Sequence, residues 1–262
     1  MANFCLAWPN RFTYGSITVS SAEPDLGGSN LANDSGSPID AWQTAGVTNG
    51  AINFILPAQD TLQAFGVFRT NLTANASIRY RVWSGTSMSD APVYDTGPKP
   101  AKVAPSYLQS VLVLPNAVTG RMLQIDLDDP GNPDGFINVP LAYAGPVWQP
   151  SRNFDASSGT GRTAQSTKTA TRGGGVVVRN DWVKRTFTVS LSGIRASEVW
   201  SKVMDADLYA RRGNNLLFVP DPADPNINLI SIFGEMDPQS EITYPNRVVE
   251  ARGYKAMVIE RL

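Results

Sequence analysis

The stretch Ile78-Arg79-Tyr80-Arg81-Val82-Trp83 indicates the fold, because Ile78, Tyr80 and Val82 alternate with the residues between them. A period of two is typical of a β-strand with one face on a core. Similar apolar runs recur on both sides of this stretch, with Pro, Gly, Asn and Asp between them, at residues 52–56, 62–69, 111–114, 123–127 and 136–141. Six short strands separated by turn residues predict a jelly-roll β-sandwich over residues 1–150.

The composition changes at residue 151. Residues 151–180 are rich in Ser, Thr, Gly and Ala and carry one acidic residue, Asp155, against five basic ones: Arg152, Arg162, Lys168, Arg172 and Arg179. Such a segment buries little apolar surface by itself. The sequence therefore leaves three interpretations open: a linker, a mobile hairpin, or a basic arm that becomes ordered on a partner.

Residues 181–262 predict a smaller α+β domain with one helix. A strand is expected at 187–191, and further strands at 216–219, 229–233 and 248–259, the last with a bulge near Gly253. Between them, residues 196–212 have a helical period, and Gly213 is the expected end of the helix. The apolar residues expected on its buried face are Val199, Trp200, Val203, Met204 and Leu208. The fold class is therefore mainly β, with one helix in the C-terminal part.

Charge and composition exclude several functions. The 262 residues include 22 basic and 23 acidic residues and no histidine, so the net charge is −1. A chain of this charge has no overall field that attracts nucleic acid or anionic membrane. Without histidine, the chain cannot form a His-activated nucleophile or a His metal site, and the single Cys5 excludes an internal disulfide. We expect no cofactor, no nucleic-acid partner, no membrane insertion and, since the start lacks a basic segment followed by an apolar run, no signal peptide.

The acidic cluster around Asp128 resembles a cation site only in composition. Counted from Asp126, the fifth position of an EF-hand loop is Pro130, and the twelfth is Ile137 where the loop needs Glu. We expect a turn capped by Asp and Asn side chains, and no metal site. Catalysis by two facing carboxylates, as in glycosidases, needs no histidine, but the sequence singles out no pair. The chain is therefore predicted not to be an enzyme.

Five residues could form a carbohydrate site on the sandwich, since aromatic faces stack on sugars while amides and guanidinium groups bind hydroxyls. They are Trp42, Asn71, Arg79, Arg81 and Trp83. The alternative is structural: Trp42 and Trp83 lie within apolar patterns that predict a core position, and Arg79 and Arg81 fit the solvated face of a strand.

Parts of the N-terminal half resemble the discoidin or galactose-binding-like sandwich. The likeness lies in Ile39-Asp40-Ala41-Trp42-Gln43-Thr44, in Phe65-Gly66-Val67-Phe68-Arg69-Thr70-Asn71-Leu72 and in Ala76-Ser77-Ile78-Arg79-Tyr80-Arg81-Val82. Residues 3–11, 128–135 and 145–151 are further similar to a group of tailed-bacteriophage tail proteins that carry such a sandwich. In that group a small β-rich tail domain with one helix follows, which residues 185–191, 217–222 and 249–262 resemble.

This resemblance implies a structural protein of a phage tail tip or baseplate, of the distal-tail or minor-tail kind. Such a protein is made in the bacterial cytoplasm, resides at the virion tail tip, and has other tail or baseplate proteins as partners. We expect a homo-oligomeric ring and a contribution to attachment at the host surface. The alternatives are a carbohydrate-binding module for host surface glycans and a carboxylate-dependent glycosidase that acts on them.

Overall fold

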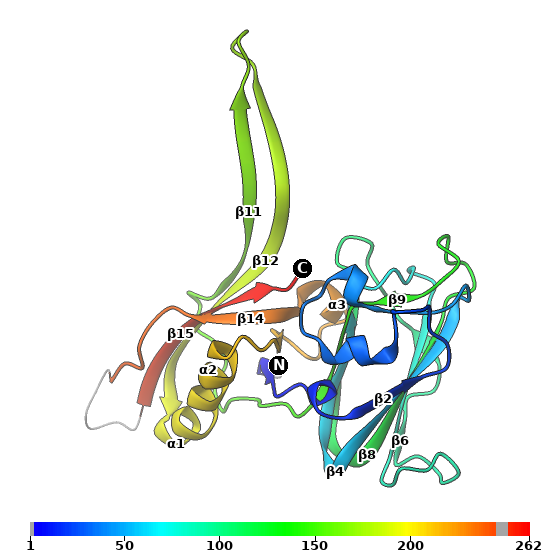
Figure 1. Ribbon diagram of the computed structural model, residues 1–262. Helices are drawn as coiled ribbons and strands as arrows, with labels where there is room; N and C mark the ends of the chain where they lie inside the picture. Colours follow the sequence, from blue (N-terminus) through cyan, green and yellow to red (C-terminus); the bar gives the residue numbers. More distant parts are fainter. Residues whose placement is uncertain (1–2, 245–250) are drawn as a thin grey trace. The chain divides into compact units, whose positions relative to one another are not determined.

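The computed structural model describes residues 3–244 and 251–262, and the chain forms two compact units (Figure 1). Unit 1 comprises residues 1–149, 216–231 and 262, and unit 2 comprises residues 150–215 and 232–261. The chain therefore leaves unit 1 at residue 150, returns to it for residues 216–231 and leaves it again. The units do not follow the three predicted ranges, because residues 216–231 belong to unit 1 and residues 151–180 belong to unit 2.

Unit 1 is a β-sandwich built on two long antiparallel strands, β4 (Asn49–Phe68) and β8 (Gln109–Asp128). The first half of β4 lies between β2 (Ser16–Val19) and the second half of β8, which pairs onward with β5 (Ser77–Trp83). The second half of β4 lies between β10 (Leu141–Gly145) and the first half of β8. The other strands and the helix of this unit are β1 (Cys5–Ala7), β3 (Trp42–Gln43), β6 (Tyr94–Asp95), β7 (Lys99–Pro100), β9 (Asn138–Val139), β13 (Leu216–Val219) and α3 (Ile227–Ile230).

The core of unit 1 contains the apolar residues of the alternating runs. Ile78, Tyr80 and Val82 of β5 are all buried in it, so the strand predicted from their alternation is confirmed. Aromatic rings connect its elements: Phe12 stacks on Phe54 with ring centroids 4.6 Å apart. Contacts of this kind add roughly 0.5–1.5 kcal/mol beyond the apolar area that they bury.

Pairs of predicted short strands are continuous in the structure. The runs at 52–56 and 62–69 are both parts of β4, and those at 111–114 and 123–127 are both parts of β8. The turn residues between the runs coincide with irregular stretches of the ladder, since the β4–β8 register shifts between Ile55 and Asp60 and again between Leu62 and Ala64. Pro57 and Pro115 lie in these irregular stretches, where a proline removes no regular ladder hydrogen bond.

Unit 2 contains a four-stranded antiparallel sheet in the order β14-β15-β12-β11. Its strands are β11 (Gly159–Ala170), β12 (Val176–Arg195), β14 (Ile232–Pro238) and β15 (Ala251–Glu260). Residues 248–250 of the predicted last strand lie outside the described part of the chain. The predicted strand at 229–233 is wrong in its first half, because residues 227–230 form one helical turn, closed by the Ser231 hydroxyl on the Ile227 carbonyl.

The predicted helix is confirmed over residues 196–211. It comprises α1 (Ala196–Glu198), a π-helical turn (Val199–Val203) and α2 (Met204–Arg211), and Gly213 follows with φ of 84°, the left-handed conformation that ends many helices. The predicted buried face is wrong in part. Val199 and Val203 are buried with Ala206 and Ala210, whereas Trp200, Met204 and Leu208 are exposed. The helix therefore buries its smaller apolar side chains and exposes the larger ones.

Over the residues that the structure describes, the chain is mainly β, with a β-sandwich and one long helix at residues 196–211, as predicted. Among residues 3–244 and 251–262, no helix combines the length and the apolar character that crossing a bilayer would require.

Candidate functional site

Both candidate tryptophans belong to the core of unit 1. Trp42 is fully buried, and its ring N–H donates to the Ser21 carbonyl at 2.8 Å. Trp83 is 2% exposed, and its ring N–H donates to the Asp90 carbonyl at 2.9 Å. Neither ring presents a face on which a sugar could stack, so the core interpretation of both residues is confirmed.

The two candidate arginines, Arg79 and Arg81 of β5, are held by carboxylates. Arg79 Nε donates to Asp95 at 2.8 Å, and Arg81 donates to Asp126 at 2.8 Å. The bond from Arg79 is the main reason why the pKa of Asp95 is lowered to about 2, and the backbone N–H of Gly97 contributes. Both pairs are partly exposed, as expected of a solvated strand face.

Asn71, the fifth candidate, organises a turn. Its amide donates to Asp134 and to the Phe136 carbonyl, both at 2.9 Å, and its side-chain oxygen accepts the backbone N–H of Asn138 at 2.7 Å. A side chain with these bonds fixes the loop before β9.

The side chains of the acidic cluster around Asp128 also form hydrogen bonds within the chain. Asp129 is buried and accepts both the backbone N–H and the hydroxyl of Thr73 at 2.7 Å, and the Asn132 side chain accepts the backbone N–H of Asp134 at 3.0 Å. The predicted Asx-capped turn is confirmed. Within residues 3–244 and 251–262, no three His, Cys, Asp or Glu residues gather as a metal site would require.

Burial keeps the single thiol in its protonated form. Cys5 is buried in β1, and burial together with the nearby Asp221 carboxylate raises the pKa of its thiol to about 12. A thiol with that pKa is almost entirely protonated at neutral pH and is a poor nucleophile.

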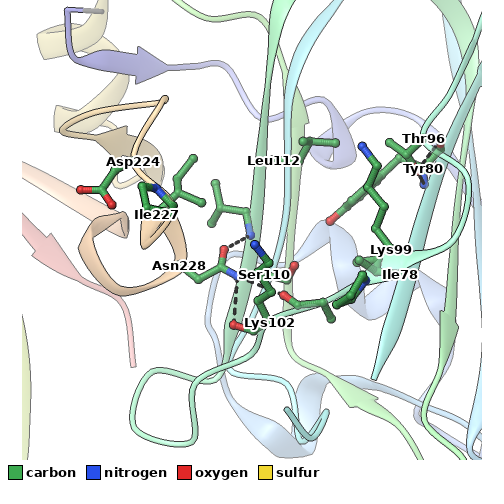
Figure 2. Close-up of a pocket in the computed structure, with 14 residues that line it drawn as sticks. Ile78, Tyr80, Thr96, Lys99, Lys102, Ser110, Leu112, Asp224, Ile227 and Asn228 are labelled. Atoms are coloured by element: carbon green, nitrogen blue, oxygen red, sulfur yellow. Dashed lines mark hydrogen bonds between the residues drawn. The ribbon is translucent and has the colours of Figure 1, made fainter. Parts of the chain in front are cut away.

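A small cavity of about 190 Å³ in unit 1 was not expected from the sequence (Figure 2). Its wall is fixed by Asn228 of α3, which accepts the Val111 N–H at 2.8 Å and donates to the carbonyls of Ala101 and Lys102 at 3.0 and 3.1 Å. Residues with polar side chains supply much of the rest of its lining: Tyr80, Thr96, Lys99, Lys102, Ser110 and Asp224. Burial raises the pKa of the Tyr80 phenol, which therefore stays protonated. None of the five candidate sugar-binding residues lines this cavity.

The most unusual surface is the hairpin of β11 and β12 in unit 2 (Figure 1). The linker interpretation of residues 151–180 is wrong, because 159–170 pair regularly with 176–188. Pairing with β15 begins only at Thr186, so residues 176–185 of β12 have β11 as their only partner strand in the described chain. At about 3.3 Å per residue, roughly 33 Å of hairpin projects beyond the sheet.

The projecting part carries large apolar side chains in solvent. The exposed fractions are 62% for Val176, 51% for Val178 and 48% for Val183, and Val177 and Trp182 are exposed as well. A two-stranded hairpin is at best marginally stable alone, and its free edges can pair with another chain. Contiguous exposed apolar residues of this kind usually mark an interaction surface.

The base of the hairpin is anchored more firmly. Arg185 and Glu260 form an ion pair whose side chains are 11% and 14% exposed. Arg185 Nε donates to one carboxylate oxygen at 2.8 Å, and its backbone N–H donates to the other at 3.0 Å. The hairpin therefore leaves a rigid sheet at a fixed point.

Comparisons with known proteins give matches in structure alone. No family model and no curated protein matches the sequence. Among solved structures, a fucose-binding module of Streptococcus pneumoniae is 10% identical and covers 53% of this chain and 98% of its own, with a TM-score of 0.42. A chitosan-binding module from a Paenibacillus chitosanase/glucanase is 17% identical, covers 53% of this chain and 100% of its own, and has a TM-score of 0.41. A family 32 carbohydrate-binding module from C. perfringens, in complex with galactose, is 10% identical, covers 53% and 98%, and has a TM-score of 0.40. Matches at these identities and TM-scores assign no ligand to this chain.

Proposed function

We propose that this chain is a structural assembly protein that works through protein–protein interfaces, as a component of a bacteriophage tail tip or baseplate. One observation carries the proposal: the projecting hairpin exposes a row of valines and a tryptophan that a second protein could bury. Each such side chain contributes up to about 1.5 kcal/mol when it is covered. The resemblance of the sequence to tail proteins supplies the viral context.

The rest of the molecule supports this proposal. The candidate sugar-binding residues are engaged in the core, in ion pairs or in a turn, and the thiol is protonated. What the surface offers to a partner is apolar area, free strand edges and basic charge. These properties suit docking on a neighbouring protein.

We expect the chain to be present in purified tailed particles from cells that encode it, with antibody label at the tail tip in electron micrographs. Trypsin should cut the free chain at Lys168, Arg172 or Arg179, and these bonds should be protected at least tenfold in the particle because a partner covers the hairpin. Cleavage at Lys102, in an exposed loop of unit 1, measured in both samples, corrects for general access of the protease. Particles that lack the chain, or equal cleavage of the hairpin in both samples, would overturn the proposal.

A carbohydrate-binding module is the second candidate function. The names of three similar solved modules state that they bind fucose, chitosan or galactose. Unit 1 has a cavity whose lining combines hydroxyls, lysines and a carboxylate with apolar side chains. At about 190 Å³ it is smaller than the roughly 300 Å³ at which ligand pockets usually begin.

If unit 1 binds sugar at this cavity, the full chain should bind at least one bacterial surface glycan on an array. Tyr80→Phe should then weaken binding about tenfold, because it removes one hydroxyl and keeps the ring that stacks on Phe65. Tyr14→Phe, at an exposed tyrosine outside the cavity, is the matched control. Binding to no glycan, or equal losses in both variants, would eliminate this candidate.

A further inference from the structure

The cavity in unit 1 contains a buried hydroxyl that the protein itself does not bind. Tyr80 lines the cavity and is 2% exposed, and its hydroxyl forms no hydrogen bond of normal geometry within the described chain. Its ring points toward Ser110 (Figure 2), whose hydroxyl lowers the pKa of the phenol, but burial raises that pKa by more. The phenol therefore keeps its proton. Buried polar groups are rarely left without a bond, so this O–H is available to an acceptor from outside the protein.

Other polar side chains of the lining already bind the chain. The Thr96 hydroxyl accepts the backbone N–H of Tyr80 at 2.9 Å and donates to the carbonyl of the next residue at 2.7 Å. The amide of Asn228 uses its oxygen and both hydrogens on backbone groups. Asp224 accepts the backbone N–H two residues further on at 2.7 Å, and its carboxylate points away from Tyr80 (Figure 2). These three side chains therefore hold the wall in place.

Two lysines add positive charge to the same cavity. Lys99 of β7 and Lys102 both line it, and neither has an ion-pair partner among residues 3–244 and 251–262. Both lysines are exposed, so a ligand could recruit them without breaking a bond in the protein. The polar groups that the cavity leaves available are thus donors, two ammonium groups and one phenol. Donors of this kind bind an anionic acceptor most strongly.

The apolar part of the lining narrows the chemistry of that anion. Ile78, Leu112 and Ile227 contribute to the wall, and a ligand with a carbon body would cover them, whereas inorganic phosphate would leave them in water. The volume of about 190 Å³ is below the roughly 300 Å³ at which pockets for drug-sized ligands begin. The cavity therefore suits a small molecule with one anionic group and an apolar side.

We propose that this cavity binds a small carboxylate, either a free organic acid or the acid group of a sugar, with Tyr80, Lys99 and Lys102 as its donors. The site goes beyond the proposed assembly function and does not depend on it. For the second candidate function, it names the class of sugar as one that carries a carboxylate.

Isothermal titration calorimetry of the purified full chain tests this site with two pairs of probes. Lactate is compared with lactamide and glucuronate with glucuronamide, because each amide keeps the shape of its acid and removes the negative charge. We expect at least one acid to bind at least tenfold more tightly than its amide and than inorganic phosphate. Tighter binding of lactate would identify a free acid as the ligand class, and tighter binding of glucuronate would identify an acidic sugar.

Variants of the three donors locate the binding. Lys99→Gln combined with Lys102→Gln should weaken binding of the acid at least tenfold, because both ammonium groups are lost. Lys255→Gln, at an exposed position of β15 in unit 2, is the matched control and should leave binding unchanged. Tyr80→Phe should weaken binding about tenfold. It should not lower the melting temperature, since the hydroxyl that it removes has no bond within the protein to lose.

The inference is overturned if neither acid binds, if phosphate binds as tightly as the acids, or if the double lysine variant binds as the control does. Equal binding of glucuronate and glucuronamide would keep a sugar site and reject the acidic ligand. A clear fall in the melting temperature of Tyr80→Phe would also overturn it, because the hydroxyl would then be bonded within the protein. None of these results concerns the hairpin, so the protease experiment on the particle decides the proposed assembly function separately.

Discussion

Trp42→Ala is expected to destabilise unit 1 by about 3–5 kcal/mol, the usual cost of removing a large aromatic side chain from a core. Trp42 is fully buried, and the loss of its ring would also leave the Ser21 carbonyl without the bond that it accepts at 2.8 Å. Urea unfolding followed by circular dichroism would measure the change in the free energy of unfolding.

Trp200→Ala is the matched control for this variant, because the same side chain is 55% exposed on the helix of unit 2. Its effect on the free energy of unfolding of a monomeric sample should stay within about 0.5 kcal/mol. Equal losses for the two variants would contradict the placement of Trp42 in the core. Loss of sugar binding in Trp42→Ala would, for the same reason, report unfolding of the sandwich.

Glu260→Ala is expected to destabilise unit 2 by about 3–5 kcal/mol. The substitution removes the carboxylate that pairs with the Arg185 guanidinium, whose side chain is 11% exposed, and breaking a buried ion pair by removing one partner is costly. It also removes the acceptor of the Arg185 backbone N–H. The loss should be visible as an earlier unfolding transition of unit 2 and as faster proteolysis at the base of the hairpin.

Asp95→Ala removes a carboxylate of comparable geometry from the more exposed pair with Arg79. Pairs near the surface contribute about 0–1 kcal/mol, because water already solvates both charges. A loss in Glu260→Ala no larger than that in Asp95→Ala would show that the Arg185–Glu260 pair is solvated in the protein.

The strands of unit 1 could be predicted because alternation reports burial on one face, as at Ile78, Tyr80 and Val82. The joining of two runs into β4, and of two others into β8, could not be predicted. In the sequence, a proline inside an irregular stretch of a strand looks the same as a proline in a turn. The helix was predictable from its period and from Gly213. Its buried face was not, because size alone favours Trp200 and Met204 for the core, while the sheet accepts the smaller Ala206 and Ala210.

The sequence by itself determined the strand rhythm, the helix, the basic segment and the absence of imidazole, since these are local or compositional properties. Only the tertiary structure decided that Asn228 binds the backbone of residues 101, 102 and 111, that residues 216–231 belong to unit 1, and that the valines of the hairpin are exposed to solvent. Burial depends on which residues from distant parts of the chain pack against a side chain. The sequence pattern of a strand does not show whether such residues cover it. The valines at 176–178 have the sequence that is typical of a core strand, but they lie at the surface.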